Sequence, residues 1–122
     1  MSQGAIIGAG IAGLATAIFA KQQGLDVTLH ERGRDTDCDD HLLWIAPNGL
    51  HILERLGVLD SIRAAAVDQE VMGFASSDLS PLMTLTGKSL RDSCGFPIVA
   101  VRRRVLWETL RDRWQALGGM VH

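Results

Sequence analysis

The chain has 122 residues, 47% of them apolar, which is the size of one domain with a real core. Its 12 basic and 14 acidic side chains give a formal charge of −2, which excludes the general positive field that attracts nucleic acid or anionic lipid. Cys38 and Cys94 are far apart and outside any CxxC pattern, so we expect neither a metal site nor a redox pair. The apolar N-terminus lacks a basic region and is interrupted by glycines, which indicates neither a signal peptide nor a membrane span. We therefore expect a cytoplasmic protein.

The first predicted elements are a strand, a tight glycine turn, a helix and a second strand, all within residues 5–31. Residues 5–7 form a short apolar run that is typical of a buried parallel strand. Apolar residues at helical spacing from Leu14 onward predict a helix that stops at Gly24. Residues 27–29 predict the second strand. This order is the fingerprint of a mononucleotide-binding βαβ unit, and it predicts an α/β fold of the Rossmann type.

The sequence GAGIAG at residues 8–13 gives each of its glycines a predicted role. Gly8 permits the turn out of the strand, Gly10 lets a pyrophosphate approach the backbone, and Gly13 lets the helix pack closely on the sheet. The anion is expected at the helix N-terminus, where unpaired N–H groups and the helix dipole favour negative charge. Glu31 ends the second strand, where a carboxylate accepts hydrogen bonds from a ribose 2′-hydroxyl and repels the 2′-phosphate of NADP. The unit therefore predicts an adenine-dinucleotide site.

The middle of the chain is predicted to be helical. Residues 32–40 form a polar loop without periodicity, and residues 42–46 are a brief apolar run. Pro47 begins a helix that Gly57 closes, and residues 59–67 make a further short helix.

The pattern then changes to short runs rich in Val, Thr, Phe and Leu, which predict strands at residues 71–76, 82–85 and 98–101. The first two are placed to form an antiparallel hairpin, in a different layer from the βαβ unit. A last helix is predicted over residues 105–117, and residues 120–122 begin a further strand.

Three blocks of the sequence together resemble the N-terminal third of FAD-dependent monooxygenases of the aromatic hydroxylase type, the group of para-hydroxybenzoate hydroxylase and salicylate hydroxylase. The first block is GAGIAGLATAIFAKQQGLDVTLHER at residues 8–32. The second, IAPNGLHILERLGVLDSI at residues 45–62, is similar to the family's proline-asparagine helix and the leucine-glycine pair that follows it. The third, GFPIVAVRRRVLWETL at residues 95–110, is similar to the block in which an arginine three residues before a leucine opens a helix. The shared order and spacing over nearly the whole chain is more specific than any single block.

The resemblance implies an FAD whose ADP half lies on the glycine turn, with Glu31 at the adenosine ribose. It also implies that Arg103 contacts the dinucleotide, a task that suits a guanidinium because it stays charged and can pair with phosphate through two hydrogen bonds. We assign no residue a catalytic or metal-binding role. The full set of predicted cofactor-binding residues is Gly8, Gly10, Ala12, Gly13, Glu31, Arg32 and Arg103.

The resemblance further implies the hydroxylation of a small aromatic substrate with O2, after reduction by NADH or NADPH. The flavin carries this chemistry, and the protein supplies position and excludes water. We expect residues 1–67 to form the FAD-binding βαβ unit and its helices, residues 68–101 the beginning of a mixed substrate-binding sheet, and residues 102–122 a helix that returns to the FAD-binding domain. The family's later glycine-aspartate motif resembles nothing in this chain. We therefore expect a truncated protein, with weak FAD affinity and no turnover on its own.

Two other functions stay open on the sequence alone. One is a non-catalytic dinucleotide-binding or interaction module, because unfinished sheet edges favour pairing with another chain or a second copy. The other is a segment of an NAD-dependent dehydrogenase, which Glu31 allows but which the second and third blocks do not resemble. We expect Trp44, Trp107 and Trp114 in the core or at a buried edge, with Trp44 near the place of the flavin in the family, and Arg102 and Arg104 at the surface.

Overall fold

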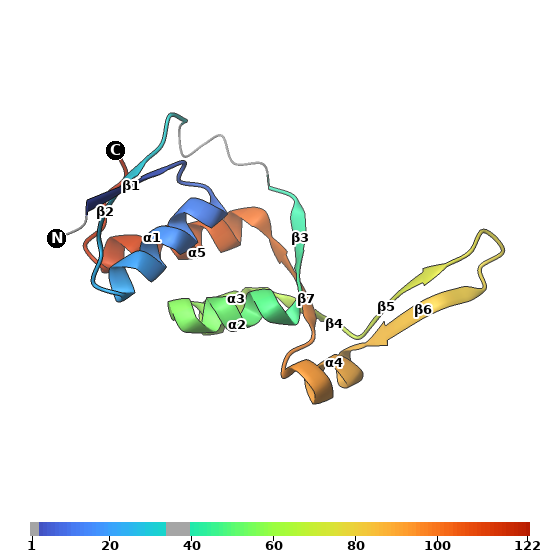
Figure 1. The fold of residues 1–122 in the computed structure, drawn as a ribbon. Coiled ribbons are helices and arrows are strands. Elements are labelled where there is room, and N and C mark those ends of the chain that lie inside the picture. Colours follow the sequence, from blue (N-terminus) through green and yellow to red (C-terminus); the bar gives the residue numbers. More distant parts are fainter. Residues whose placement is uncertain (1–2, 34–39) are drawn as a thin grey trace.

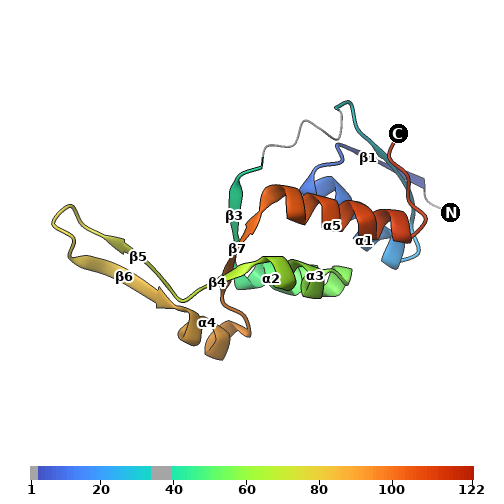
Figure 2. The ribbon, with the colours of Figure 1, turned by 180° about the vertical axis from the view of Figure 1, so that it is seen from behind.

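A computed structural model describes residues 3–33 and 40–122 of the chain. Most of the polar loop predicted over residues 32–40, and Cys38 within it, lies outside the described residues. Figure 1 shows a helical body that carries the opening strands on one side, with a hairpin that extends away from it. Figure 2 shows the same arrangement from behind.

The opening unit consists of β1 (Gln3–Ile7), α1 (Ile11–Gln22) and β2 (Asp26–His30). β1 and β2 are parallel neighbours throughout their length. Gly8, between β1 and α1, has a φ of 100°, a backbone conformation that residues other than glycine rarely adopt. A Cβ atom on Gly13 would overlap the carbonyl oxygen of Gly8, so only glycine lets α1 pack so closely on the end of β1. The predicted strand–turn–helix–strand order and the α/β class are confirmed.

A second sheet has the strand order β3-β7-β4 and is antiparallel. Its strands are β3 (Leu42–Ile45), β7 (Ile98–Arg102) and β4 (Val67–Gln69). Two helices connect β3 to β4: α2 (Pro47–Leu56) keeps the predicted bounds, and α3 (Leu59–Ala65) ends earlier than predicted. The prediction for residues 59–67 was wrong at its end, because Val67 pairs with Ala100 as the first residue of β4.

The hairpin is formed by β5 (Val71–Ala75) and β6 (Pro81–Thr86), which are antiparallel, as predicted. Helix α4 (Gly87–Cys94) follows and was not predicted. Its sequence, GKSLRDSC, has Leu90 as its one large aliphatic side chain and therefore no apolar stripe, and Gly87 is its one buried residue. Its local signal is a capping box, in which the side chains of Thr86 and Ser89 each bond the backbone N–H of the other residue.

Helix α5 (Arg103–Ala116) follows β7 and packs on α1. After α5 the chain reaches β2, where Val121 forms a parallel bridge with Leu29. His122 donates its backbone N–H to the Leu29 carbonyl at 2.9 Å and accepts the N–H of Glu31 at 2.8 Å. The strand predicted to begin at residues 120–122 is thus present as a short parallel contact with β2.

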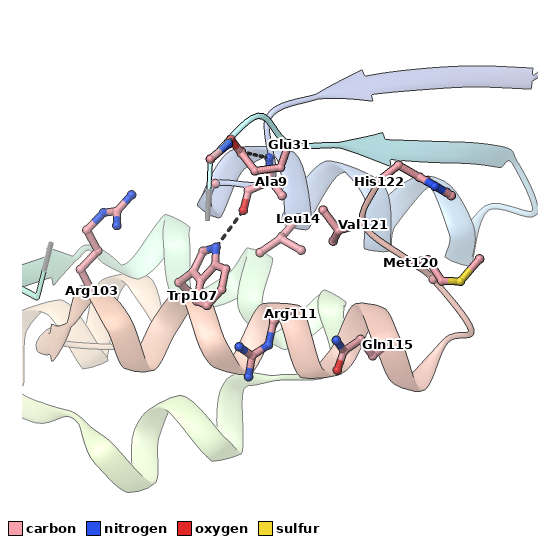
Figure 3. A pocket seen from close by; sticks show the side chains of 13 residues that line it. Ala9, Leu14, Glu31, Arg103, Trp107, Arg111, Gln115, Met120, Val121 and His122 are labelled. Carbon is pink, nitrogen blue, oxygen red and sulfur yellow. Dashed lines mark hydrogen bonds between the residues drawn. The ribbon is translucent and has the colours of Figure 1, made fainter. Parts of the chain in front are cut away.

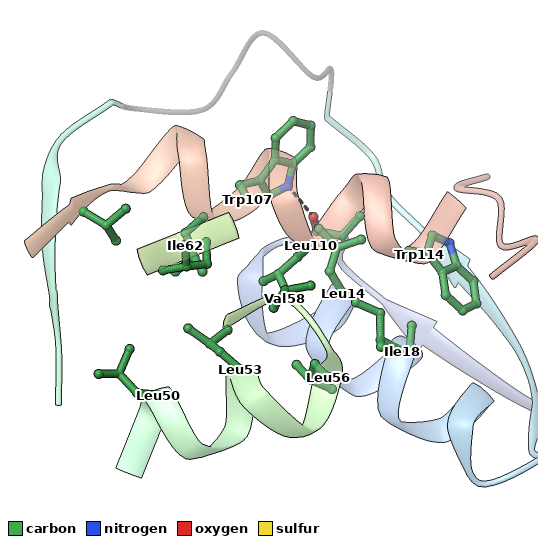
Figure 4. Close-up of a cluster of buried hydrophobic side chains, with 14 of the residues drawn as sticks. Leu14, Ile18, Leu50, Leu53, Leu56, Val58, Ile62, Trp107, Leu110 and Trp114 are labelled. Atoms are coloured by element: carbon green, nitrogen blue, oxygen red, sulfur yellow. Dashed lines mark hydrogen bonds between the residues drawn. The ribbon is translucent and has the colours of Figure 1, made fainter. Parts of the chain in front are cut away.

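The core lies between the helices and the inner faces of β2 and β7 (Figure 4). Its largest fully buried side chains include Leu14, Ile18, Leu29, Leu50, Leu56, Ile62, Val99, Val101, Leu110 and Trp114. Trp107 and Trp114 are buried as expected, but Trp44 is 67% exposed, so its predicted place in the core was wrong. Trp44 pairs with Ala100 and so lies on the same face of the β3-β7-β4 sheet as Ala100. Val99 and Val101 lie on the other, buried face, because neighbouring residues on a strand alternate between faces. None of the helices in the described ranges is long and apolar enough to cross a membrane.

Candidate functional site

A groove of about 800 Å³ lies beside the start of α1, between the end of β2 and one side of α5 (Figure 3). Three of the predicted cofactor residues line it: Gly10, Glu31 and Arg103. A smaller pocket of about 400 Å³ adjoins it at Glu31 and is lined by Gly8 and Arg32 as well. The fold therefore brings residues from three separate stretches of the chain to one end of α1.

The two remaining predicted residues lie differently. Gly13 packs against Gly8 and serves the close approach of α1 to β1. Ala12 is exposed in the first turn of α1, and its carbonyl accepts the hydroxyl of Thr16 at 2.8 Å. Ala12 lines neither of the two pockets, so its contact with a cofactor stays a prediction.

The N-terminus of α1 faces open space. Gly10 occupies the N-cap position, no side chain caps the helix, and no acidic residue stands in its first turn. A Cβ atom on Gly8 or on Gly10 would meet nothing within 4 Å. The backbone N–H groups of a first helical turn have no partners within the helix, so this end of α1 offers donors and a positive dipole to an anion.

The Glu31 carboxylate holds the glycine turn. One carboxylate oxygen accepts the backbone N–H of Ala9 at 2.7 Å, and the other accepts the N–H of Gly33 at 2.8 Å. The bond from Gly33, and next the bond from Ala9, lower the pKa of Glu31 below its ordinary value of 4.5. Glu31 is thus charged at neutral pH. Each carboxylate oxygen has a second lone pair, so both bonds leave room for a ribose hydroxyl to donate.

Trp107 reaches the glycine turn from the opposite wall. Its buried indole N–H donates to the carbonyl of Ala9 at 2.8 Å, across 98 positions of sequence. The guanidinium of Arg111 lies over the Trp107 ring, 5.0 Å from its centroid, which is within the range of a cation–π contact. Both side chains line the groove, with Gln115 beyond them.

Sequence reasoning assigned Trp107 and Arg111 no part in the site. Trp107 was expected only to fill the core. The available signal was their spacing from Arg103, since residues four and eight positions later on a helix share its face.

Neighbouring arginines at the start of α5 have different surroundings. Arg103 follows β7 directly, donates its backbone N–H to the backbone carbonyl of His41 at 2.8 Å, and lines the groove with a half-buried side chain. Arg102 is 65% exposed and pairs with Asp40 at 2.9 Å. Arg102 therefore lies at the surface, as predicted, whereas Arg104 is partly buried.

The groove can hold an elongated anionic ligand. It combines the donors of a helix N-terminus, a guanidinium and an acceptor carboxylate, which suit a pyrophosphate and an adjacent ribose. No group of three or more His, Cys, Asp or Glu side chains suited to a metal ion occurs within the described ranges.

Comparison with known proteins agrees with this chemistry. A family model described as "FAD binding domain" matches residues 1–116. The 3-hydroxybenzoate 6-hydroxylase of Klebsiella oxytoca is 31% identical over 113 residues, which are 91% of this chain and 28% of that protein. The 3-amino-4-hydroxybenzoate 2-monooxygenase of Streptomyces cremeus is 30% identical over 108 residues, 87% of this chain and 27% of that protein.

Among solved structures, the tetrameric form of 2-methyl-3-hydroxypyridine-5-carboxylic acid oxygenase matches all of this chain with a TM-score of 0.81 and 28% identity. This chain covers 31% of that structure, and it spans about a quarter of the length of the relatives named above. The family match favours the flavoprotein hypothesis over the NAD-dependent dehydrogenase. The chain belongs to the FAD binding domain family, in the form found in FAD-dependent monooxygenases of the aromatic hydroxylase type.

Proposed function

We propose that the groove of about 800 Å³ binds the ADP half of FAD. The pyrophosphate lies at the N-terminus of α1 beside Gly8 and Gly10, Arg103 pairs with it, and Glu31 accepts hydrogen bonds from the ribose. The single observation that carries this proposal is that Gly10, Glu31 and Arg103, which are distant in sequence, line the same groove.

The residues present fit the group in shape and charge. The open space before Gly8 and Gly10 leaves the turn accessible to a phosphate, and the uncapped helix end supplies donors to it. The charged Glu31 carboxylate accepts hydroxyl protons and disfavours a 2′-phosphate at the same place.

The activity that we propose for a protein containing this domain is the hydroxylation of an aromatic or similar small organic substrate with NADH or NADPH and O2. The names of the two hydroxybenzoate-acting relatives support this substrate class. The flavin supplies the redox chemistry when it is bound. The residues described here bind and orient its ADP half, and residues 68–101 are proposed to begin the substrate-binding sheet. We also propose a cytoplasmic location, which suits the exposed free thiol of Cys94.

A titration with FAD, followed by flavin fluorescence, tests the cofactor site. We expect saturable binding to the wild-type chain. The Kd of Arg103→Gln should be about tenfold higher, because this variant loses one charge-assisted contact with the cofactor. Arg102→Gln is the matched control, because it removes the neighbouring guanidinium, which pairs with Asp40 and does not line the groove. The absence of saturable binding to the wild type, or an equal loss in both variants, would contradict the proposal.

A second candidate function is an interaction module that pairs with another copy of the chain. The observation that favours it is an uncovered apolar sheet face, on which Leu42, Trp44 and Val67 are each about two-thirds exposed. Leu42 and Trp44 stand opposite Arg102 and Ala100 in the register, and Val67 stands opposite Ala100 from the other side, so all three share this face. Light scattering over a range of protein concentrations tests it: a concentration-dependent dimer that Trp44→Ser weakens supports the module, and a monomer at all concentrations rejects it.

A further inference from the structure

The backbone of the glycine turn is held from several directions. The Gly8 N–H donates to the His30 carbonyl at 2.7 Å, and the Gly10 carbonyl accepts the N–H of Leu14 at 2.9 Å. Between them, both polar groups of Ala9 are bound by side chains: the N–H by Glu31 and the carbonyl by Trp107. Glu31 belongs to the βαβ unit itself, but Trp107 comes from α5. The hydrogen bond to the Ala9 carbonyl therefore depends on the packing of α5 against the βαβ unit.

The bond from Trp107 fixes an entire peptide plane. The Ala9 carbonyl and the Gly10 N–H belong to one planar trans peptide, so they point in opposite directions, and fixing one fixes the other. Gly10 allows this plane more than one orientation, since glycine has access to both signs of φ. A reversed plane would exchange the directions of the carbonyl oxygen and the Gly10 N–H. The oxygen repels an anion, whereas the N–H attracts one.

The indole that makes this bond has little freedom to move. Trp107 is 8% exposed and Ala9 is 4% exposed, so the hydrogen bond lies in the core, where an unpaired carbonyl is costly. Arg111 lies over the ring from the next turn of α5, and its guanidinium is itself bonded to Asp112 at 2.9 Å and 3.1 Å. Figure 3 shows the indole and Glu31 bonded to Ala9 from two sides of the turn.

We propose that Trp107 is a positioning residue of the dinucleotide site: its indole N–H orients the Ala9–Gly10 peptide so that the turn presents donors to a pyrophosphate. This inference rests on the proposed function of the groove. Trp107 of α5, which lies outside the glycine motif, would then contribute to the preference of the site for a pyrophosphate. Removal of the indole N–H should therefore weaken the binding of ligands with phosphates and spare the binding of ligands without them.

The test compares ADP and adenosine as ligands of the wild type and Trp107→Phe, by calorimetry. Phenylalanine keeps an aromatic ring in the core and removes the donor. We expect the Kd for ADP to rise about tenfold, the equivalent of one hydrogen bond, and the Kd for adenosine to change less than about twofold. Ile62→Val is the control for stability, because it trims a buried side chain of α3 that lines neither pocket. Ile62→Val should lower the thermal stability about as much as Trp107→Phe does and leave the affinities for ADP and adenosine unchanged.

Equal losses for ADP and adenosine would overturn the inference, because they would make Trp107 a simple wall of the groove. Unchanged affinity for ADP would also overturn it. Amide hydrogen exchange of residues 8–14 in the ligand-free protein gives a second measurement. We expect faster exchange at the Ala9 amide in Trp107→Phe and not in Ile62→Val, and equal exchange would reject the positioning role. A wild type that binds neither ligand would refute the proposed function, and the exchange measurement would still decide whether Trp107 orders the turn.

Discussion

The helical body and the β5–β6 hairpin are held together in different ways. In the body, α1 and α5 bury Leu14, Ile18, Leu110 and Trp114 almost completely, and the contacts join opposite ends of the chain. In the hairpin, the strands pair only with each other, and large apolar side chains such as Phe74 stay about two-thirds exposed. The groove belongs to the body, so its walls are held in place by this long-range packing. The hairpin owes its shape mainly to the pairing of its own two strands.

The hairpin is joined to the body by a small group of charges. Arg91 on α4 pairs with Glu70 at 2.6 Å and with Asp68 at 3.0 Å, and Asp68 also pairs with Arg63 of α3 at 3.2 Å. The backbone N–H of Gly87 donates to the Glu70 carbonyl at 2.8 Å, at the base of the hairpin. These contacts lie near the surface, so they tie the two regions with far less energy than the core supplies to the body.

Among the changes at the glycine turn and its contacts, the largest effect is expected from Gly13→Ala in the body. The added methyl group would overlap the Gly8 carbonyl, so α1 must move away from β1. We expect a loss of about 3 kcal/mol in the free energy of unfolding, the upper part of the range for overpacked sites, measured by urea denaturation. Gly10→Ala is the matched control, because a Cβ atom there meets nothing within 4 Å. It should keep most of the stability and lose FAD affinity, and a large loss of stability at Gly10 would contradict this division of roles.

A smaller effect on the body is expected from the protonation of Glu31. Its folded-state pKa is lowered, so the stability that the charged carboxylate contributes is complete above the ordinary value of 4.5 and is lost as the pH falls through the lower folded value. Unfolding curves from about pH 7 to about pH 3 should show wild type more stable than Glu31→Gln near neutrality, with the difference shrinking below about pH 4.5. Glu54→Gln removes an exposed carboxylate of α2 that lies away from the turn. At pH 7 this variant should lose less stability than Glu31→Gln, because the Glu54 carboxylate is exposed.

The charged contacts that join the hairpin to the body are expected to contribute less than about 1 kcal/mol to the free energy of unfolding. Arg91→Gln removes the ion pairs with Asp68 and Glu70, which should speed amide exchange in β5 and β6 and leave exchange in α1 unchanged. Lys88→Gln on the same helix removes the exposed pair with Asp92 and should change neither region. Faster exchange throughout the chain in Arg91→Gln would show that the hairpin and the body unfold together.

The same contrast explains what the sequence could predict. The βαβ unit was predictable because its turn, its helix stripe and Glu31 lie within one short stretch, where each residue has a local reason for its place. The hairpin was predictable for the same reason. By contrast, β3 and β4 are short runs that become strands only by pairing with β7, and α4 has a cap but no apolar stripe. Nothing near Trp107 in sequence indicates Ala9, which lies 98 positions earlier, so this part of the site needed the fold.

The smallest effect is expected from Phe74→Ser in the hairpin. Phe74 pairs with Met83 across the two strands and is 65% exposed, so its replacement should change the free energy of unfolding by less than about 0.5 kcal/mol and leave FAD affinity unchanged. By contrast, Leu110→Ala, in the fully buried face of α5, should lower the free energy of unfolding by about 2–5 kcal/mol. A large loss in Phe74→Ser would mean that the hairpin is covered in solution. If that loss grew with protein concentration, the cover would be a second copy of the chain, because association stabilises a fold by mass action, and the hairpin would then belong to an interface.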